Sequence, residues 1–161
     1  MKKSRRLPWD AALSTGENAR RHLPALAHEF FGAGRELLAG PAAPADLHAF
    51  RLAAKRFRYT LELFRPLYGR GLDAKLEAVR RIQSLLGKRQ DCEVLAGRLR
   101  LPAQSSEELR AALEKCERQG LKLEQEFRAY WLDIFDAPGQ ELSWARYLAR
   151  RPAAPRNRNM L

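Results

Sequence analysis

The stretch His48 to Phe64 reads HAFRLAAKRFRYTLELF and carries two helical patterns at once. Three phenylalanines recur every seven residues, and at about 100° per residue they share one face that is suited to burial. The opposite face is basic, with His48, Arg51, Lys55 and Arg58 at positions i, i+3, i+7 and i+10. At about 1.5 Å per residue, this row covers roughly 15 Å of helix axis. Such a row suits an extended polyanion, which needs donors along its length rather than in a single pocket.

A solvated surface is the alternative explanation, because amphipathic helices with a charged outer face are common. Two features weigh against it. The basic face has one sign at four positions, whereas surface helices usually mix signs for i, i+4 support. Neighbouring cations also repel one another, and a bound anion would relieve that repulsion. For His48, the alternative is a helix-start residue bonded to the backbone. The sequence leaves these alternatives open.

Composition predicts one domain with one core, since the chain has 161 residues and 45% of them are apolar. Lys and Arg number 30 against 19 Asp and Glu, which gives a net charge of +11. This excess favours phosphate-rich partners, namely nucleic acid, polyphosphate or an anionic membrane surface. Arginine dominates over lysine, and its planar fork fits phosphate oxygens.

The two cysteines, Cys92 and Cys116, have no metal-ligand spacing, and we interpret them as reduced core thiols in a cytosolic protein. The basic N-terminus is not followed by the apolar segment of a signal peptide. No run approaches the roughly 20 apolar residues of a membrane span. These features predict a cytoplasmic protein.

Helical periodicity predicts an all-α fold. Ser14 and Glu17 have capping-box spacing and predict a first helix from there to about Ala39, with a kink or restart at Pro24. The second helix is expected from about Ala45 to Tyr68, with its last turn frayed or bent at Pro66. The third begins near Leu72, and its inner row is predicted to contain Leu72, Leu76, Val79, Gln83 and Leu86, with Ile82 alongside and with Val94, Leu95 and Leu99 continuing the pattern.

Gly87 either permits a close approach by a neighbouring helix or ligand, or divides two helices. The fourth helix is expected from about Glu107 to Phe135. Its bundle seam is predicted to consist of Leu109, Leu113, Cys116, Gly120, Leu123, Phe127, Tyr130 and Ile134. Trp144, Tyr147 and Leu148 indicate a short docking helix. We therefore expect a helical domain over 14–136, a basic, loosely ordered lead-in over 1–13, and an extension over 137–161 that is disordered after about 150.

No catalytic motif was found in the sequence: there is no phosphate-binding loop, no nucleophile elbow and no HExxH spacing. The glutamates of the fourth helix alternate with Lys and Arg, which favours i, i+4 ion pairs over metal binding. We therefore predict no catalytic residues, no metal and no cofactor.

A second motif follows the basic row. The stretch Leu85 to Leu95 reads LLGKRQDCEVL and contains Leu86, Gly87, Arg89 and Asp91. Together with His48, Arg51, Lys55, Arg56, Arg58, Tyr59, Leu61 and Phe64, it resembles the CHAD family, the conserved histidine α-helical domain. The family pattern is a histidine that opens a helix, Arg and Lys at helical spacing, and a downstream leucine–glycine pair with a basic residue and an aspartate.

The resemblance implies a four-helix CHAD repeat whose basic residues line a surface groove or pore and bind inorganic polyphosphate. It also implies association with polyphosphate granules or polyphosphate-handling enzymes. The first binding candidates are His48, Arg51, Lys55 and Arg58. Second are Arg56, Arg81, Lys88 and Arg89, while Arg118 and Lys122 rest on charge placement alone.

Two departures from the family pattern affect the interpretation. Family members often contain two four-helix repeats, and this chain has room for one, so either one repeat suffices or two copies form a homodimer. Lys55 stands where arginine is common, which keeps the charge and loses the fork. We interpret the chain as a non-enzymatic polyphosphate-binding module. The rivals are an RNA- or DNA-binding helical protein, for which Tyr59 is the main base-stacking candidate, and an enzyme or accessory subunit acting on polyphosphate or triphosphates.

Overall fold

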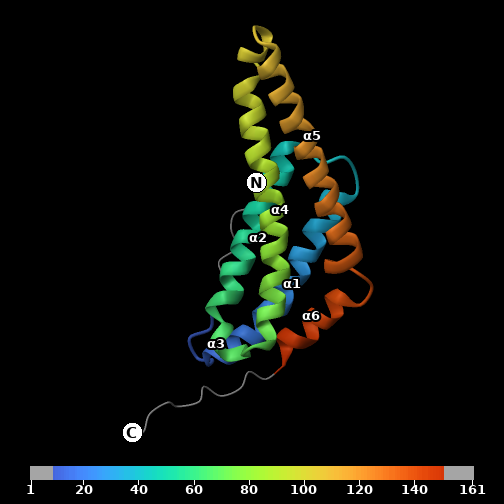
Figure 1. The fold of residues 1–161 in the computed structure, drawn as a ribbon. Coiled ribbons are helices and arrows are strands. Elements are labelled where there is room, and N and C mark those ends of the chain that lie inside the picture. The colour runs from blue at the N-terminus through green and yellow to red at the C-terminus, as the bar shows by residue number, and fades with distance from the viewer. Residues whose placement is uncertain (1–8, 151–161) are drawn as a thin grey trace.

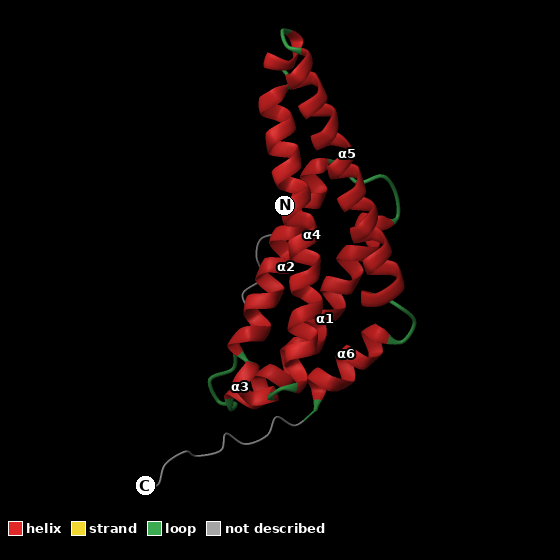
Figure 2. Ribbon diagram, viewed as in Figure 1, coloured by secondary structure: helices red, strands yellow, loops and turns green. Residues whose placement is uncertain are grey.

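The computed structural model describes residues 9–150, which are helical and contain no β-strand (Figure 2). The expected all-α fold is confirmed. The expectations for residues 1–8 and for those after 150 lie outside this range. In chain order the elements are α1 (Thr15–Leu38), α2 (Pro44–Leu63), α3 (Arg65–Tyr68), α4 (Gly71–Leu99), a 3₁₀ turn (Pro102–Gln104), α5 (Glu107–Tyr130), a π-helical turn (Trp131–Phe135) and α6 (Gln140–Ala149).

The helices pack against one another in successive pairs. α2 contacts α1 on one side and α4 on the other, α4 contacts α5 along its length, and α6 packs on α1. The C-terminal part of α4 and the N-terminal part of α5 extend beyond the other helices as a two-helix arm (Figure 1). The bundle core therefore lies in the lower two-thirds of the view, and the arm stands above it.

Residues just before α1 are held by a buried side chain. The expected capping box is present, since the Ser14 hydroxyl accepts from the Glu17 amide at 3.2 Å and the Ser14 amide donates to the Glu17 carboxylate at 2.9 Å. Asn18 is 1% exposed, and its Oδ1 accepts from the Asp10 amide at 2.9 Å. Residues 9–13 are thus anchored rather than loose. Pro24 neither divides nor restarts α1, which continues to Leu38.

Proline fixes both ends of α2. Pro44 opens the helix, where its missing N–H is not needed, and the Asp46 carboxylate accepts from the Ala43 amide at 3.3 Å. The chain was expected to remain in this helix to Tyr68. Instead α2 ends at Leu63, and Pro66 lies in the first turn of the separate helix α3.

α4 is one continuous helix through Gly87, so this glycine does not divide two helices. Four members of the expected inner row are buried, but Gln83 lies half-buried at the edge facing α2. The core positions beside it belong to Ile82 and Leu85. Val94 and Leu95 are 45% and 46% exposed because they lie on the arm, which the other helices do not cover.

The predicted seam of the last long helix is wrong at its C-terminal end. Ile134 is 58% exposed and Tyr130 only half-buried, whereas Trp131 and Phe135 are buried. The π-helical turn over Trp131–Phe135 holds more residues per turn than an α-helix, so side chains four apart stay aligned after Phe127. The buried row is therefore Phe127, Trp131 and Phe135.

Aromatic rings form the centre of the core. Phe30 of α1 stacks on Phe57 of α2, with ring centroids 4.7 Å apart, and lies edge-on to Trp131 at 5.7 Å. Phe31 stacks on Phe135 at 4.8 Å and meets Trp144 of α6 at 5.9 Å. This cluster joins α1, α2, the π-helical turn and α6, and edge-to-face and offset pairs of this kind stabilise beyond simple burial.

At Gly34, α1 packs directly against the indole of Trp131 in the π-helical turn. A Cβ at this position would overlap the buried indole of Trp131. We therefore expect Gly34→Ala to lower the free energy of unfolding by about 1–3 kcal/mol, the usual cost of overpacking. Thermal or urea unfolding followed by circular dichroism measures the change.

The matched control is Gly32→Ala on the same helix. A Cβ at Gly32 meets no atom within 4 Å, so this variant should be neutral or gain up to about 1 kcal/mol from helix propensity. Equal stability of the two variants would contradict the assigned packing of Trp131.

Candidate functional site

The basic row of α2, which consists of His48, Arg51, Lys55 and Arg58, lies along the edge of α2 that faces α4. The two helices run antiparallel, and α4 presents Gln83, Gly87 and Gln90 at helical spacing to this row. Arg58 Nε donates to Gln83 Oε1 at 2.6 Å, and His48 Nδ1 lies 3.2 Å from Gln90 Oε1. The first-choice residues predicted from the sequence are therefore brought together on one surface.

On α4, Gly87 lies between Gln83 and Gln90 and leaves space for the Arg51 side chain. A Cβ built at Gly87 would stand 3.7 Å from Arg51 Nε and would meet no other described atom within 4 Å, apart from the neighbouring residues and the backbone of α4 itself. Of the two sequence hypotheses for Gly87, the structure favours close approach. The group that approaches is a cationic side chain of the row.

The two glutamines of α4 use only their oxygens in the contacts to the row. Each Oε1 is the acceptor for a row residue, and within residues 9–150 no acceptor is found for the side-chain N–H groups, which are therefore available to an anion. The contact to Gln90 places a donor at His48 Nδ1, and Nε2 becomes a second donor when the imidazole is protonated. His48 is thus oriented by a side chain of α4 rather than by the helix backbone.

Arg58 is the most constrained member of the row. Besides Gln83, it contacts the Glu62 carboxylate at 2.5 Å and lies over the Tyr59 ring at 4.4 Å. Arg80 of α4 reaches the same Glu62 oxygen at 3.0 Å. Burial disfavours the charged form of Glu62, but the hydrogen bonds from Arg80 and Arg58 outweigh it and lower the pKa of Glu62.

Arg51 and Lys55 are not neutralised within the described residues. No carboxylate of residues 9–150 lies within 4.0 Å of either cation. The one described contact of Lys55 with charge character is to the Tyr59 ring, whose centroid is 5.7 Å from Nζ. Two adjacent cations without counter-ions form the part of the row best able to take an external anion.

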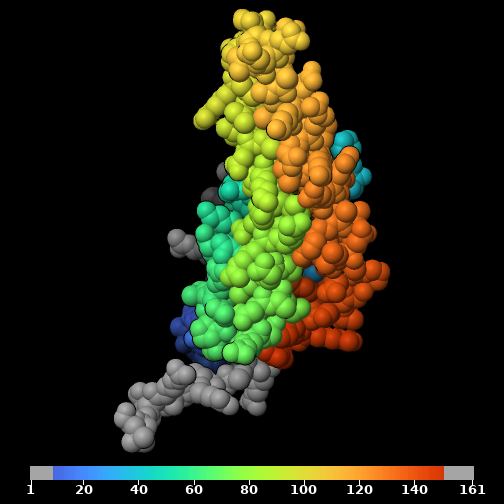
Figure 3. Space-filling view, in the orientation of Figure 1, coloured from blue at the N-terminus to red at the C-terminus, as the bar shows by residue number. Residues whose placement is uncertain are grey.

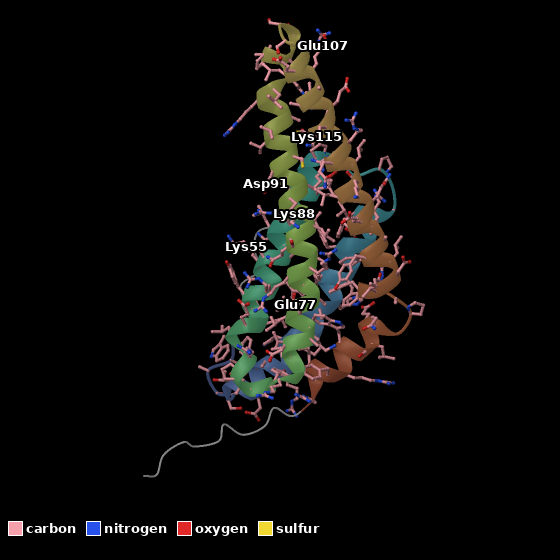
Figure 4. All side chains as sticks on the ribbon, in the orientation of Figure 1. Lys55, Glu77, Lys88, Asp91, Glu107 and Lys115 are labelled. Atoms are coloured by element: carbon pink, nitrogen blue, oxygen red, sulfur yellow. The ribbon has the colours of Figure 1, made fainter. Side chains whose placement is uncertain are left out.

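Two second-choice candidates, Arg81 and Lys88, lie on α4, and Lys122, which rests on charge placement alone, lies on the neighbouring helix α5. Lys88 is exposed on the outer side of α4, with Glu77 and Asp91 along the same side (Figure 4). Arg81 lies seven residues before Lys88 and close to Tyr130 of α5. Burial raises the pKa of the Tyr130 phenol, and the positive charge of Arg81 partly opposes that rise. Lys122 is exposed on α5. Figure 3 shows α2, α4 and α5 side by side on this surface.

Arg118, Arg89 and Arg56 stand apart from the row. Arg118 is on the arm and pairs with Glu114 at 3.5 Å. Arg89 turns toward α5, where its side chain is 13% exposed and contacts Glu93 at 2.9 Å and Glu124 at 3.7 Å. Arg56 follows Lys55 and therefore points about 100° away around α2. The structure does not bring these three together with His48.

Sequence reasoning missed three residues of this surface, namely Arg80, Gln83 and Gln90. Their spacing with Gly87 is i, i+3, i+7 and i+10, the same as that of the basic row on α2. This shared spacing was the available signal. Gln83 was predicted to lie in the core row, because it is three residues before Leu86 and so lies near the boundary between the buried face of α4 and the face toward α2.

A pocket lies away from the row. With a volume of about 370 Å³, it opens at the junction of α5 and α6, near Arg35, Asp136 and Glu141. The Arg35 guanidinium is held there by both carboxylates, at 2.5 Å and 2.7 Å, which keeps its pKa above the ordinary range and leaves it neutralised. The described residues contain no cluster of three His, Cys, Asp or Glu able to hold a metal ion.

No helix within residues 9–150 is long and apolar enough to cross a membrane. Neither the curated proteins nor the solved structures give a significant match to the chain. The family model of the CHAD domain matches residues 3–100, which include the basic row and the residues of α4 that face it, Gln83, Gly87 and Gln90. This match covers more than half of the 161 residues, and the chain therefore belongs to the CHAD family.

Proposed function

We propose that the chain binds inorganic polyphosphate along the basic row of α2 and the facing amides of α4, without catalysing a reaction. The observation that carries this proposal is the pair of cations Arg51 and Lys55, which have no ionic partner within residues 9–150 and lie between the contacts of Arg58 with Gln83 and of His48 with Gln90. A polyphosphate chain presents charged oxygens at short, regular intervals and has no bases to accommodate. The CHAD family is linked to polyphosphate and triphosphate handling, which supports the same ligand class.

We further propose that the protein is cytoplasmic and associates with polyphosphate granules or polyphosphate-metabolising enzymes. Arg81 and Lys88 of α4 and Lys122 of α5 would extend the contact surface for a long chain, because α2, α4 and α5 lie side by side. Association with an enzyme of polyphosphate or triphosphate metabolism would make the chain an accessory subunit rather than the catalyst.

Binding of single-stranded nucleic acid is the second candidate function, and Tyr59 supports it. Its ring is 50% exposed and lies beside two cations of the row, the arrangement that base stacking requires. One ring offers a single stacking position, whereas the row has three cations and a histidine. Titration with long-chain polyphosphate, RNA and duplex DNA at matched phosphate and salt separates the two candidates. Equal affinity for all three would favour the nucleic-acid function.

Removal of the two unpaired cations should abolish most binding without unfolding the protein. We expect Arg51→Ala with Lys55→Ala to weaken polyphosphate binding strongly and to change stability by less than about 0.5 kcal/mol per site, because neither cation has an ionic partner in the described chain. Calorimetric titration and thermal unfolding measure the two effects. Arg58 is unsuitable for this test, since its removal also breaks bonds to Gln83 and Glu62.

The control for lost charge is Arg98→Ala with Arg146→Ala. Both residues are exposed, on the arm and on α6, and neither is in the row. This variant should bind nearly as well as the unmodified protein. If the two double variants lose affinity equally, the net charge and not the row determines binding.

Gly87 offers a test of the local geometry. Gly87→Ala should keep polyphosphate affinity, because its Cβ would remain in ordinary contact with Arg51 at 3.7 Å, and should stabilise α4 by up to about 1 kcal/mol. Gly87→Leu should weaken binding, since the longer side chain occupies the space that Arg51 crosses. Gly97→Leu, on the exposed part of the same helix, is the control. Unchanged affinity of Gly87→Leu would show that the placement of Arg51 over Gly87 is irrelevant to binding.

We also propose that two copies pair on one polyanion, because a single repeat supplies one basic row. A two-fold interface uses the same surface twice, and a bridging anion offsets the repulsion between two chains of net charge +11. Size exclusion with light scattering should give a monomer or weak dimer alone and a 2:1 protein-to-ligand complex with polyphosphate. A short oligomer must be included, since a long chain collects independent monomers. Tight binding of the short oligomer to a species that stays monomeric would exclude the dimer.

A further inference from the structure

The basic row ends in a carboxylate. Glu62 lies one turn beyond Arg58 on α2, and its side chain is 28% exposed. Its Oε1 accepts from Arg58 at 2.5 Å and from Arg80 at 3.0 Å. Two guanidinium groups, one from each helix, thus converge on a single oxygen. This is the arrangement by which arginines bind a phosphate oxygen, so the last position of the row is already occupied by an anion of the protein itself.

Arg58 has two further partners besides Glu62. The Arg58 guanidinium also donates to Gln83 Oε1 at 2.6 Å and lies 4.4 Å from the centroid of the Tyr59 ring. Arg80 likewise has a second partner in Glu77, at 3.5 Å. Removal of the Glu62 charge would therefore leave both cations near the end of the row, with one fewer competing anion.

We propose that Glu62 is a built-in competitor that makes the row selective for long polyanions, an inference that rests on the proposed polyphosphate function. A carboxylate on the same helix has a high effective concentration at the two arginines. A free phosphate or a very short chain must displace it from solution. A chain already bound at Arg51 and Lys55 presents its next phosphates at a comparably high local concentration and displaces Glu62 from Arg58 and Arg80.

The test is Glu62→Gln, which keeps the shape and an acceptor oxygen and removes the charge. The probes are tripolyphosphate and a long-chain polyphosphate, titrated at several salt concentrations. We expect tripolyphosphate to bind about threefold to tenfold more tightly to the variant, as for the loss of one competing ion pair. Long-chain affinity should rise less, so the preference for the long chain should fall. For tripolyphosphate, the salt dependence of binding should steepen by about one unit of slope, by analogy with nucleic acids, because one more of its phosphates is neutralised in the variant.

The matched control is Glu77→Gln. It changes the net charge equally and touches Arg80, but Glu77 is 73% exposed and has no contact with Arg58. It should leave both affinities within about twofold of the unmodified protein, since exposed pairs are weak. Thermal unfolding of each variant checks that the fold is kept, and Glu62→Asp, which keeps the charge on a shorter side chain, should stay close to the unmodified protein in selectivity.

The outcomes distinguish the inference from the function on which it rests. If the unmodified protein binds polyphosphate but Glu62→Gln binds tripolyphosphate no better or more weakly, Glu62 positions the arginines and the inference is wrong while the function stands. If both Gln variants gain equally, net charge alone explains the effect and the inference is again wrong. If neither the unmodified protein nor any variant binds either probe, the proposed function and the inference are both excluded.

Discussion

Trp131 determines how far α1 and α5 stand apart. Its indole is fully buried against Gly34, and its ring centroid lies 5.7 Å from that of Phe30 and 5.4 Å from that of Phe50. Phe50 belongs to α2, so the cluster that separates α1 from α5 also fixes the rotation of α2 about its own axis. Since a helix presents opposite faces to core and solvent, burying Phe50 and Phe57 directs Arg51 and Lys55 toward the edge shared with α4.

The excess of positive charge along the α2–α4 edge is a local feature of the described residues. Residues 9–150 contain all 19 acidic residues and all but seven of the 30 Lys and Arg, so the described body has a net charge of only +4. Elsewhere in this body many arginines are matched by carboxylates, as Arg35 is by Asp136 and Arg65 is by Asp73. Like charges one turn apart destabilise a helix by about 0.2–0.5 kcal/mol per pair. Arg51 and Lys55 form such a pair, and the aromatic core outweighs that cost.

The period of α2 could be read from the sequence because both of its faces follow from one helix alone. Phe50, Phe57 and the basic row kept their predicted faces. The spacing of Gln83 with Gly87 and Gln90 was visible in the sequence, but its pairing with Arg58 was not, because that pairing depends on which helix packs beside α2 and in which register. The C-terminal seam failed for a different reason: Phe127 is followed by apolar residues on both sides of Tyr130, and only the π-helical turn decides between Ile134 and Phe135. The periodicity of one helix thus indicates which of its faces is buried, whereas the contacts between helices depend on how the helices pack.

The choice of glutamine on α4 has a physical consequence for the row. A carboxylate at position 83 would add a second counter-ion to Arg58 beside Glu62, and an apolar side chain would leave the Arg58 Nε without an acceptor, at a cost of about 1–3 kcal/mol. The amide accepts from the cation without removing its charge, and its own N–H groups remain free for an anion. Gln90 stands in the same relation to His48. Neutral acceptors thus orient the ends of the row while its positive charge is preserved, and Glu62 is the single acidic acceptor among these described contacts.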